Sequence, residues 1–264
     1  MVLPIITQKL IQLTKGVGEF IRGEAQIFDR EHIEYKGLHD MVSYVDKTAE
    51  RELVNGLSQI LPDAGFITEE QTKVELGDEY NWIVDPLDGT TNFIHGVPVF
   101  SISIALQYKG ELVLGVVYEI NRDECFSAWK NGGAYLNGKR ISVSNAPKIE
   151  NTLLATGFPF YEFSKMEKYI NVLRILMQKC HGLRRIGSAA VDLAYVACGR
   201  FDGYFEYNLN SYDMAAGMIL VTEAGGQTFD FKGGNGCFER REIIATNGRI
   251  SSELLEVVKK EFAD

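Results

Sequence analysis

The stretch Asp85-Pro-Leu-Asp-Gly-Thr-Thr-Asn-Phe93 decides how this chain is interpreted. It follows Asn81-Trp-Ile-Val84, a short apolar run with the length and composition of a buried strand. The stretch contains a proline that fixes its own φ and a glycine that permits a sharp change of direction, so it predicts a turn. The strand therefore delivers two carboxylates, Asp85 and Asp88, at its end.

Two carboxylates three residues apart can point to one side of a turn, where their charges repel unless a cation lies between them. Mg²⁺ binds through one or two carboxylates and keeps positions for water and phosphate. The pattern therefore indicates a metal-dependent phosphoryl-transfer site. The same residue types also form ordinary solvated turns, so this stretch by itself leaves both interpretations open.

Length and charge narrow the possible partners. The chain has 264 residues, enough to bury a large core as one domain or as two closely packed halves. Lys and Arg number 27 against 36 Asp and Glu, a net charge of -9, which argues against nucleic acid or an anionic membrane as the main partner. An anionic small substrate would need help from a bound cation or from helix N-termini.

We expect a cytoplasmic protein. The first ten residues lack the basic region, the long apolar core and the cleavage site of a signal peptide, and no apolar run approaches the length of a membrane span. The four cysteines are scattered without a C-x-x-C pair, which favours free thiols in a reducing compartment.

Hydrophobic spacing predicts two amphipathic helices in the first half, over residues 3–21 and from about 46 to 61. Residues 65–70 are expected to form a strand that ends in two acids. Between residues 99 and 143, β-rich runs are separated by Lys-Gly and Asn-Gly turn signals. We expect residues 1–145 to form two helices on a largely antiparallel sheet.

The second half, residues 146–264, alternates predicted strands and helices. Strands are expected at 153–156, 183–186 and 202–206, and helices at 163–180, 189–198, 213–224 and 252–262. This alternation predicts an α/β half, and the absence of a flexible linker predicts that both halves share one compact body.

Two other acidic sites could join the first pair. Glu69 and Glu70 end a predicted strand, and adjacent strand residues face opposite ways, so only one of them can be a ligand. Asp213 precedes a small-residue helix, where Asp is a favoured N-cap. Capping leaves its second carboxylate oxygen for another partner.

Several motifs, in register along nearly the whole chain, resemble those of the inositol monophosphatase family. Residues 85–93 resemble D-P-[IL]-D-G-T-x-N-F, Tyr212-Asp-Met-Ala-Ala-Gly217 resembles W-D-x-A-A-G, and Thr68-Glu-Glu70 resembles G-E-E. Three further segments fit as well: residues 184–190, 199–206 and 222–226. Tyr212 and Thr68 replace the usual Trp and Gly without removing a ligand.

The resemblance implies an α+β fold, a layered α/β/α/β/α sandwich with an antiparallel sheet half followed by an α/β half. It also implies two or three Mg²⁺ held by four carboxylates and one carbonyl oxygen: Glu69, Asp85, the carbonyl of Leu87, Asp88 and Asp213. Thr90, assisted by Glu69, would orient the metal-bound water that attacks phosphorus.

The resemblance further implies a substrate site. The amides of Gly89 and Thr90 would receive phosphate oxygens, and Ala189 and Glu206 would contact substrate hydroxyls. Lys36 and Asp40 would belong to a mobile loop that helps to close over the third metal.

The implied activity is Mg²⁺-dependent hydrolysis of inositol monophosphate or a related small phosphate ester, with lithium sensitivity and a homodimer as family traits. The same metal core serves fructose 1,6-bisphosphate, the 2'-phosphate of NADP and 3'-phosphoadenosine 5'-phosphate, so the substrate stays open. A metal-dependent binding protein without turnover is the alternative from another class.

Overall fold

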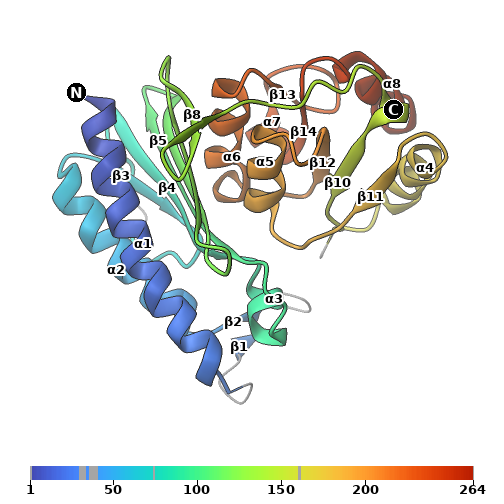
Figure 1. Cartoon of the computed structure of the whole chain (residues 1–264). Coiled ribbons are helices and arrows are strands. Elements are labelled where there is room, and N and C mark those ends of the chain that lie inside the picture. The colour runs from blue at the N-terminus through green and yellow to red at the C-terminus, as the bar shows by residue number, and fades with distance from the viewer. Residues whose placement is uncertain (1, 30–33, 36–40, 74, 160–161, 264) are drawn as a thin grey trace.

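The computed structural model describes residues 2–29, 34–35, 41–73, 75–159 and 162–263. Figure 1 shows five layers, with two helices, a sheet, two helices, a second sheet and two helices in order across the molecule. The helices of these layers are α1 (Leu3–Ile27), α2 (Tyr44–Ile60), α5 (Ala189–Ala197), α6 (Ser211–Glu223), α4 (Met166–Met177) and α8 (Ser251–Phe262). The predicted α/β/α/β/α order is confirmed.

The first sheet has seven strands in the order β3-β4-β5-β6-β7-β8-β9 and is antiparallel except for the parallel pair β3 and β4. Its strands are β3 (Gly65–Thr68), β4 (Tyr80–Asp88), β5 (Ser101–Tyr108), β6 (Glu111–Glu119), β7 (Glu124–Trp129), β8 (Gly133–Leu136) and β9 (Lys139–Ile141). The hairpin turns at 109–110 and 137–138 have left-handed backbone at both residues, as their sequences predict.

The second sheet has five strands in the order β11-β10-β12-β14-β13. Its strands are β10 (Leu153–Thr156), β11 (Gly182–Arg184), β12 (Gly203–Tyr207), β13 (Gln227–Phe229) and β14 (Glu242–Thr246). Strand β10 is parallel to both neighbours, whereas β14 is antiparallel to β12 and β13. Short elements complete the described chain: β1 (Glu34–Tyr35), β2 (Met41–Val42), α3 (Thr90–His95), η2 (Ile149–Asn151) and α7 (Cys237–Arg240).

The largest apolar cluster joins the two sheets through α5 and α6. All nine residues of α5 are buried, because this helix lies between two sheets and carries almost no polar side chains. Ile83 and Val117 of the first sheet belong to the same cluster as Leu193 of α5 and Ile243 of β14. Burial of this continuous apolar surface fixes the two halves against each other.

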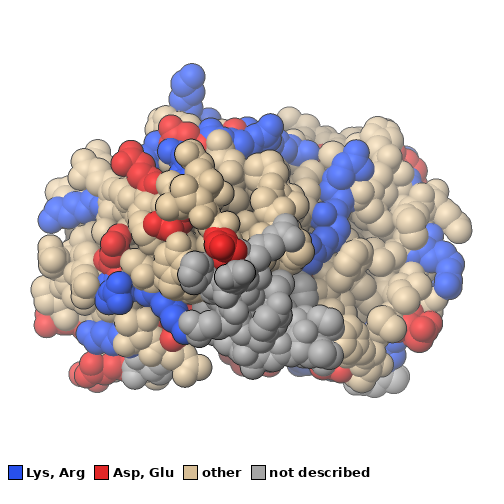
Figure 2. Space-filling model, turned by 90° about the horizontal axis from the view of Figure 1, so that it is seen from below, with Lys and Arg blue, Asp and Glu red and all other residues tan. Residues whose placement is uncertain are grey.

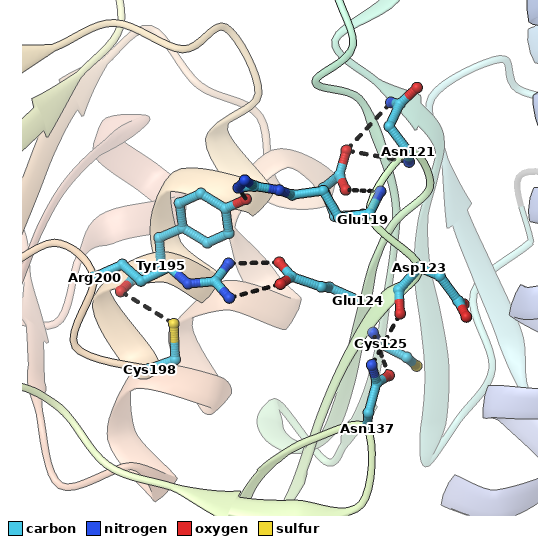
Figure 3. A network of polar contacts seen from close by, with 10 residues as sticks. Glu119, Asn121, Asp123, Glu124, Cys125, Asn137, Tyr195, Cys198 and Arg200 are labelled. Atoms are coloured by element: carbon cyan, nitrogen blue, oxygen red, sulfur yellow. Dashed lines mark hydrogen bonds and ion pairs between the residues drawn. The ribbon is translucent and has the colours of Figure 1, made fainter.

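A polar network also connects the first sheet to the end of α5 (Figure 3). Arg200 makes two hydrogen bonds to the Glu124 carboxylate, at 2.5 and 2.6 Å, and its guanidinium lies 4.6 Å from the centre of the Tyr195 ring. Glu119 accepts a 2.6 Å hydrogen bond from the amide of Arg122 and so shapes the turn before β7. These contacts position α5, whose other end enters the site described below.

Helix α2 begins at Tyr44, two residues before the predicted start. Ser43 is its N-cap: the Ser43 hydroxyl accepts from the amide of Val45 at 3.1 Å, and Asp46 accepts from the amide of Ser43 at 2.8 Å. These reciprocal hydrogen bonds between Ser43 and Asp46 start the helix at Tyr44, before the first residue of the apolar pattern used for the prediction. No helix within the described residues combines the length and apolar character needed to cross a membrane.

Candidate active site

The stretch 85–93 is mostly strand and short helix, not the predicted turn. Strand β4 continues through Asp88, and its pairing with β5 shifts register between Asp85 and Asp88. Gly89 follows with φ 97°, and a Cβ there would lie 3.1 Å from the carbonyl oxygen of Val99. An irregular strand end followed by an obligatory glycine therefore presents the two carboxylates.

Every predicted site residue that the structure describes lines one pocket of about 130 Å³. The nine are Glu69, Asp85, Leu87, Asp88, Gly89, Thr90, Ala189, Glu206 and Asp213. They come from β3–β4, the start of α3, α5, β12 and α6, so both halves of the chain contribute. Lys36 and Asp40 lie outside the described residues.

Hydrogen bonds tie the 85–93 stretch to the start of α5. Asp88 accepts from the Ser188 hydroxyl at 2.6 Å and from the amide of Ala190 at 2.7 Å. The Asn92 side-chain amide donates to the carbonyl of Ile186 at 2.8 Å. The first sheet and α5 are thereby connected directly at the pocket.

Glu69 follows the last residue of β3, and its amide donates to the carbonyl of Val84 at 3.2 Å. The amide of Glu70 instead donates to the buried carboxylate of Glu50 at 2.7 Å. Of the two acids, only Glu69 lines the pocket. This placement agrees with the expectation that adjacent acids face opposite ways.

Asp213 is not an N-cap. Helix α6 begins at Ser211 with Asn210 as the capping position, so Asp213 lies in the first turn and accepts from the amide of Asn210 at 2.6 Å. Its negative charge lies at the positive end of the helix dipole, where it is stabilised. The helix begins two residues before Asp213 because Asn210 caps it, whereas the prediction started the helix at the small-residue run.

The pocket concentrates negative charge in a buried place. Burial, followed by repulsion from neighbouring carboxylates, raises the pKa of both Glu69 and Asp85 well above their usual range. Burial raises the pKa of Asp88 to about 6 and that of Asp213 to about 7. Arg185 is the one cationic side chain among the described residues that line this pocket.

This donor set fits a hard divalent cation. The Glu69 Oε2 atom is buried without a hydrogen-bond partner, and carboxylates with a backbone carbonyl are the oxygen ligands that Mg²⁺ accepts. Within the described residues, however, no three acidic, His or Cys side chains already converge as a ligand group. Several of these carboxylate oxygens instead accept hydrogen bonds from nearby amides and hydroxyls.

Thr90 contacts a carboxylate that sequence reasoning missed. Its hydroxyl lies 3.0 Å from Asp46 Oδ1 and 2.9 Å from the carbonyl oxygen of Leu87, and no described hydrogen bond joins it to Glu69. Asp46 is thus a further carboxylate beside Thr90, and the assistance of Glu69 in orienting the water stays a prediction. The Ser43-x-x-Asp46 capping pattern could have located this acid, although not its contact 44 residues away.

Other lining residues were also missed: Gly157, Arg185, Ser188, Asp192, Asn208 and Tyr212. Asp192 lies one turn into α5, and its Oδ1 atom is buried without a hydrogen-bond partner. Glu206, next to it in the pocket lining, accepts from the Tyr204 hydroxyl, and burial raises its pKa to about 8. The sequence of α5, mostly small and apolar residues, does not indicate that Asp192 faces the pocket.

Gly157 fixes the position of Glu206. A Cβ at this glycine would lie 2.0 Å from the Glu206 carboxyl group, so Gly157→Ala should displace that side chain. We expect KM for a hydroxylated phosphate ester to rise about tenfold while the fold is kept, because the substrate contact that the family resemblance implies for Glu206 would be lost. Steady-state kinetics test this. Gly16→Ala, where a Cβ meets no atom within 4 Å, is the matched control and should change neither KM nor kcat.

Comparison with known proteins agrees with this geometry. The family model described as "Inositol monophosphatase family" matches residues 5–262. The inositol-1-monophosphatase of Mesorhizobium japonicum is 42% identical over 255 residues, covering 96% of each chain, and the Nus factor SuhB of Escherichia coli K12 is 41% identical over the same coverage.

Solved structures give the same result. The extragenic suppressor protein SuhB of Bartonella henselae has a TM-score of 0.92 at 40% identity, covering 97% of this chain and 99% of that one. The Thermotoga maritima inositol monophosphatase has a TM-score of 0.86 at 35% identity, covering 95% of each. The motifs, the layered fold and these matches together show that the chain belongs to the inositol monophosphatase family.

Proposed function

We propose that this protein is a Mg²⁺-dependent phosphatase that hydrolyses inositol monophosphate or a closely related small phosphate monoester. The observation that carries the proposal is the group of four carboxylates from both halves of the chain that line one pocket: Asp85 is buried, and Glu69 has a buried oxygen without a hydrogen-bond partner. Buried like charges are costly unless they bind a cation.

Glu69, Asp85, Asp88, Asp213 and the carbonyl of Leu87 would hold two or three Mg²⁺. When bound there, Mg²⁺ would lower the pKa of a bound water and stabilise negative charge on the phosphate and the leaving oxygen. Asp88 ends β4 of the first sheet and Asp213 lies in α6, so ligand binding would also draw these two layers together.

Thr90 and Asp46 would prepare the attacking water. The Thr90 hydroxyl donates to a carboxylate, which leaves its oxygen able to accept a hydrogen bond from water. Asp46 is itself held by the amide of Ser43, so its orientation is fixed before substrate binds. A carboxylate fixed in this way can accept a proton through the Thr90 hydroxyl as the water attacks.

The opposite side of the pocket would bind the alcohol part of the ester. Ala189 starts α5 and leaves room because it has no longer side chain, whereas Glu206 lies on the buried face of β12. A carboxyl group at this depth suits hydroxyl groups of a polyol. The amides of Gly89 and Thr90 would receive the phosphate oxygens.

A panel of phosphate esters tests the proposal. Initial hydrolysis rates should be measured with inositol 1-monophosphate, fructose 1,6-bisphosphate, NADP and 3'-phosphoadenosine 5'-phosphate, with and without MgCl₂ and with LiCl. We expect the highest kcat/KM for the inositol ester, no release without Mg²⁺ and inhibition by Li⁺. No phosphate release from any ester at any Mg²⁺ concentration would favour the binding role instead.

The raised pKa values predict how the metal-free protein responds to pH. Asp88 and Asp213 bind protons in the folded chain up to about pH 6 and about pH 7, respectively, above their ordinary 3.8. Between the ordinary and the raised pKa values the folded state binds more protons than the unfolded state, so stability falls as pH rises from about 4 to about 7.

Each such group contributes at most about 1.4 kcal/mol per pH unit. Thermal melting in EDTA at pH 5, 6, 7 and 8 measures the decline, and saturating Mg²⁺ should restore stability at pH 8 because it binds the ionised carboxylates. Asp213→Asn should show a shallower decline. An equal decline in this variant would contradict the prediction.

The surface charge and the cysteines support the proposed partner class and location. Basic and acidic side chains are interspersed over much of the face in Figure 2 rather than gathered into one basic surface, which supports a small-molecule substrate over nucleic acid. The four cysteines are unpaired, which supports a reducing cytoplasm. The homodimer remains a prediction from the family resemblance.

A further inference from the structure

A second pocket, separate from the candidate active site, is formed entirely by residues of the second half of the chain. It is formed by the start of α4, the end of α8 and the segment around α7, and α4 and α8 lie side by side there in Figure 1. Its volume is about 500 Å³, within the range of small-molecule sites, and it shares no lining residue with the active-site pocket.

The lining of this pocket is strongly basic. Five of its ten residues are Lys or Arg, whereas Lys and Arg make up 27 of the 264 residues of this acidic chain. The five are Lys165, Lys168, Lys232, Arg240 and Lys259. Two carboxylates, Glu239 and Glu242, also line it, so the cations remain in excess.

Two of these lysines occupy places where a cation is unfavourable. Lys165 is the N-cap of α4 and makes no side-chain capping hydrogen bond, and Lys168 lies in the first turn. The helix dipole is positive at this end, and Ser, Thr, Asp or Asn is preferred at the cap. An anion between the two lysines would be attracted by both side chains and by the dipole.

Part of this charge is already compensated by carboxylates within the described residues. Arg240 pairs with Asp230 at 3.2 Å, and Asp230 also accepts from the amides of Lys232 and Gly234. Glu242 is 5% exposed and accepts from the amide of Phe231 at 3.1 Å. The Lys168 ammonium donates to a backbone carbonyl, that of Ala263, at 3.2 Å.

We propose that this pocket binds a small soluble polyanion carrying two phosphate-type groups. The concave shape favours a compact ligand over an extended nucleic-acid backbone, and the overall charge of -9 disfavours a nucleic-acid partner. Two phosphate-type groups match the separate pairs of cations contributed by α4 and by the α7 and α8 side of the pocket.

Isothermal titration calorimetry with inorganic pyrophosphate tests the proposal on the full chain. EDTA is included so that the acidic active site, free of metal, repels the anion; the result is then independent of the proposed hydrolysis. We expect one saturable site per chain. The Lys165→Glu/Lys168→Glu variant should bind about tenfold more weakly or not at all, because two attractive charges become repulsive.

The matched control is Lys9→Glu/Lys139→Glu, which makes the same change in net charge at exposed lysines of α1 and β9. It should bind like the parent, and thermal melting should show that all three proteins fold. No saturable heat at millimolar pyrophosphate, or equal weakening in both variants, would overturn the proposal. Binding of a single-stranded oligonucleotide, but not pyrophosphate, with the same variant sensitivity would replace it by a nucleic-acid site.

Discussion

Asp85→Asn should reduce kcat for the inositol ester by about 10³-fold or more while the fold is kept. Asp85 lies in β4, close to the carboxylates of Glu69 and Asp88, and is one of the predicted Mg²⁺ ligands. Its Oδ1 atom accepts from the amide of Leu87 at 2.9 Å, and the Asn side-chain oxygen can accept the same bond. The substitution therefore removes charge without removing the local hydrogen bond.

The same variant should melt at an equal or higher temperature than the parent in EDTA. Burial and neighbouring carboxylates disfavour the ionised form of Asp85, so a neutral side chain relieves repulsion in the metal-free protein. The stabilisation produced by Mg²⁺ should become smaller, because one ligand charge is gone.

Activity and melting together separate catalysis from folding. Asp63→Asn changes an exposed acid just before β3 and is the control that should leave kcat and both melting temperatures unchanged. An Asp85→Asn protein with substantial Mg²⁺-dependent turnover would contradict the assignment of Asp85 as a ligand. A variant that unfolds in EDTA would show instead that this charge stabilises the metal-free fold.

The sequence predicts the layers well because periodicity reports which face of each element is buried. The 3.6-residue spacing locates α1 and α2, and the Lys109-Gly110 turn fixes the hairpin between β5 and β6. All nine described site residues carried over from the family resemblance line one pocket. Their roles as ligands or substrate contacts remain predictions that the experiments above address.

The missed features depend on contacts between residues far apart in sequence. Asp46 reaches Thr90 only because α2 packs on β4, and Ser188 reaches Asp88 across 100 residues. Asp213 lies in the first turn of α6 because Asn210, a polar residue outside the apolar pattern, caps the helix. Hydrophobic spacing identifies a buried face, but it does not identify which polar groups on that face become partners.

Thr90→Ala should lower kcat by about 10²-fold to 10³-fold with a small change in KM. The variant loses the hydroxyl that lies 3.0 Å from Asp46 and 2.9 Å from the carbonyl of Leu87, and with it the group that would orient water. Thr90→Ser keeps the hydroxyl and should retain most activity. Rescue by Ser would distinguish a role for the hydroxyl from a general packing defect.

Thr222→Ala is the matched control for Thr90→Ala, because the exposed Thr222 hydroxyl also donates to a backbone carbonyl, that of Met218, at 2.9 Å. It should leave kcat unchanged. The Thr90→Ala and Asp46→Asn losses should not add in the double variant, since both substitutions interrupt one hydrogen-bonded unit. Fully additive losses would mean that Asp46 acts separately from Thr90, and the proton path through the hydroxyl would then be wrong.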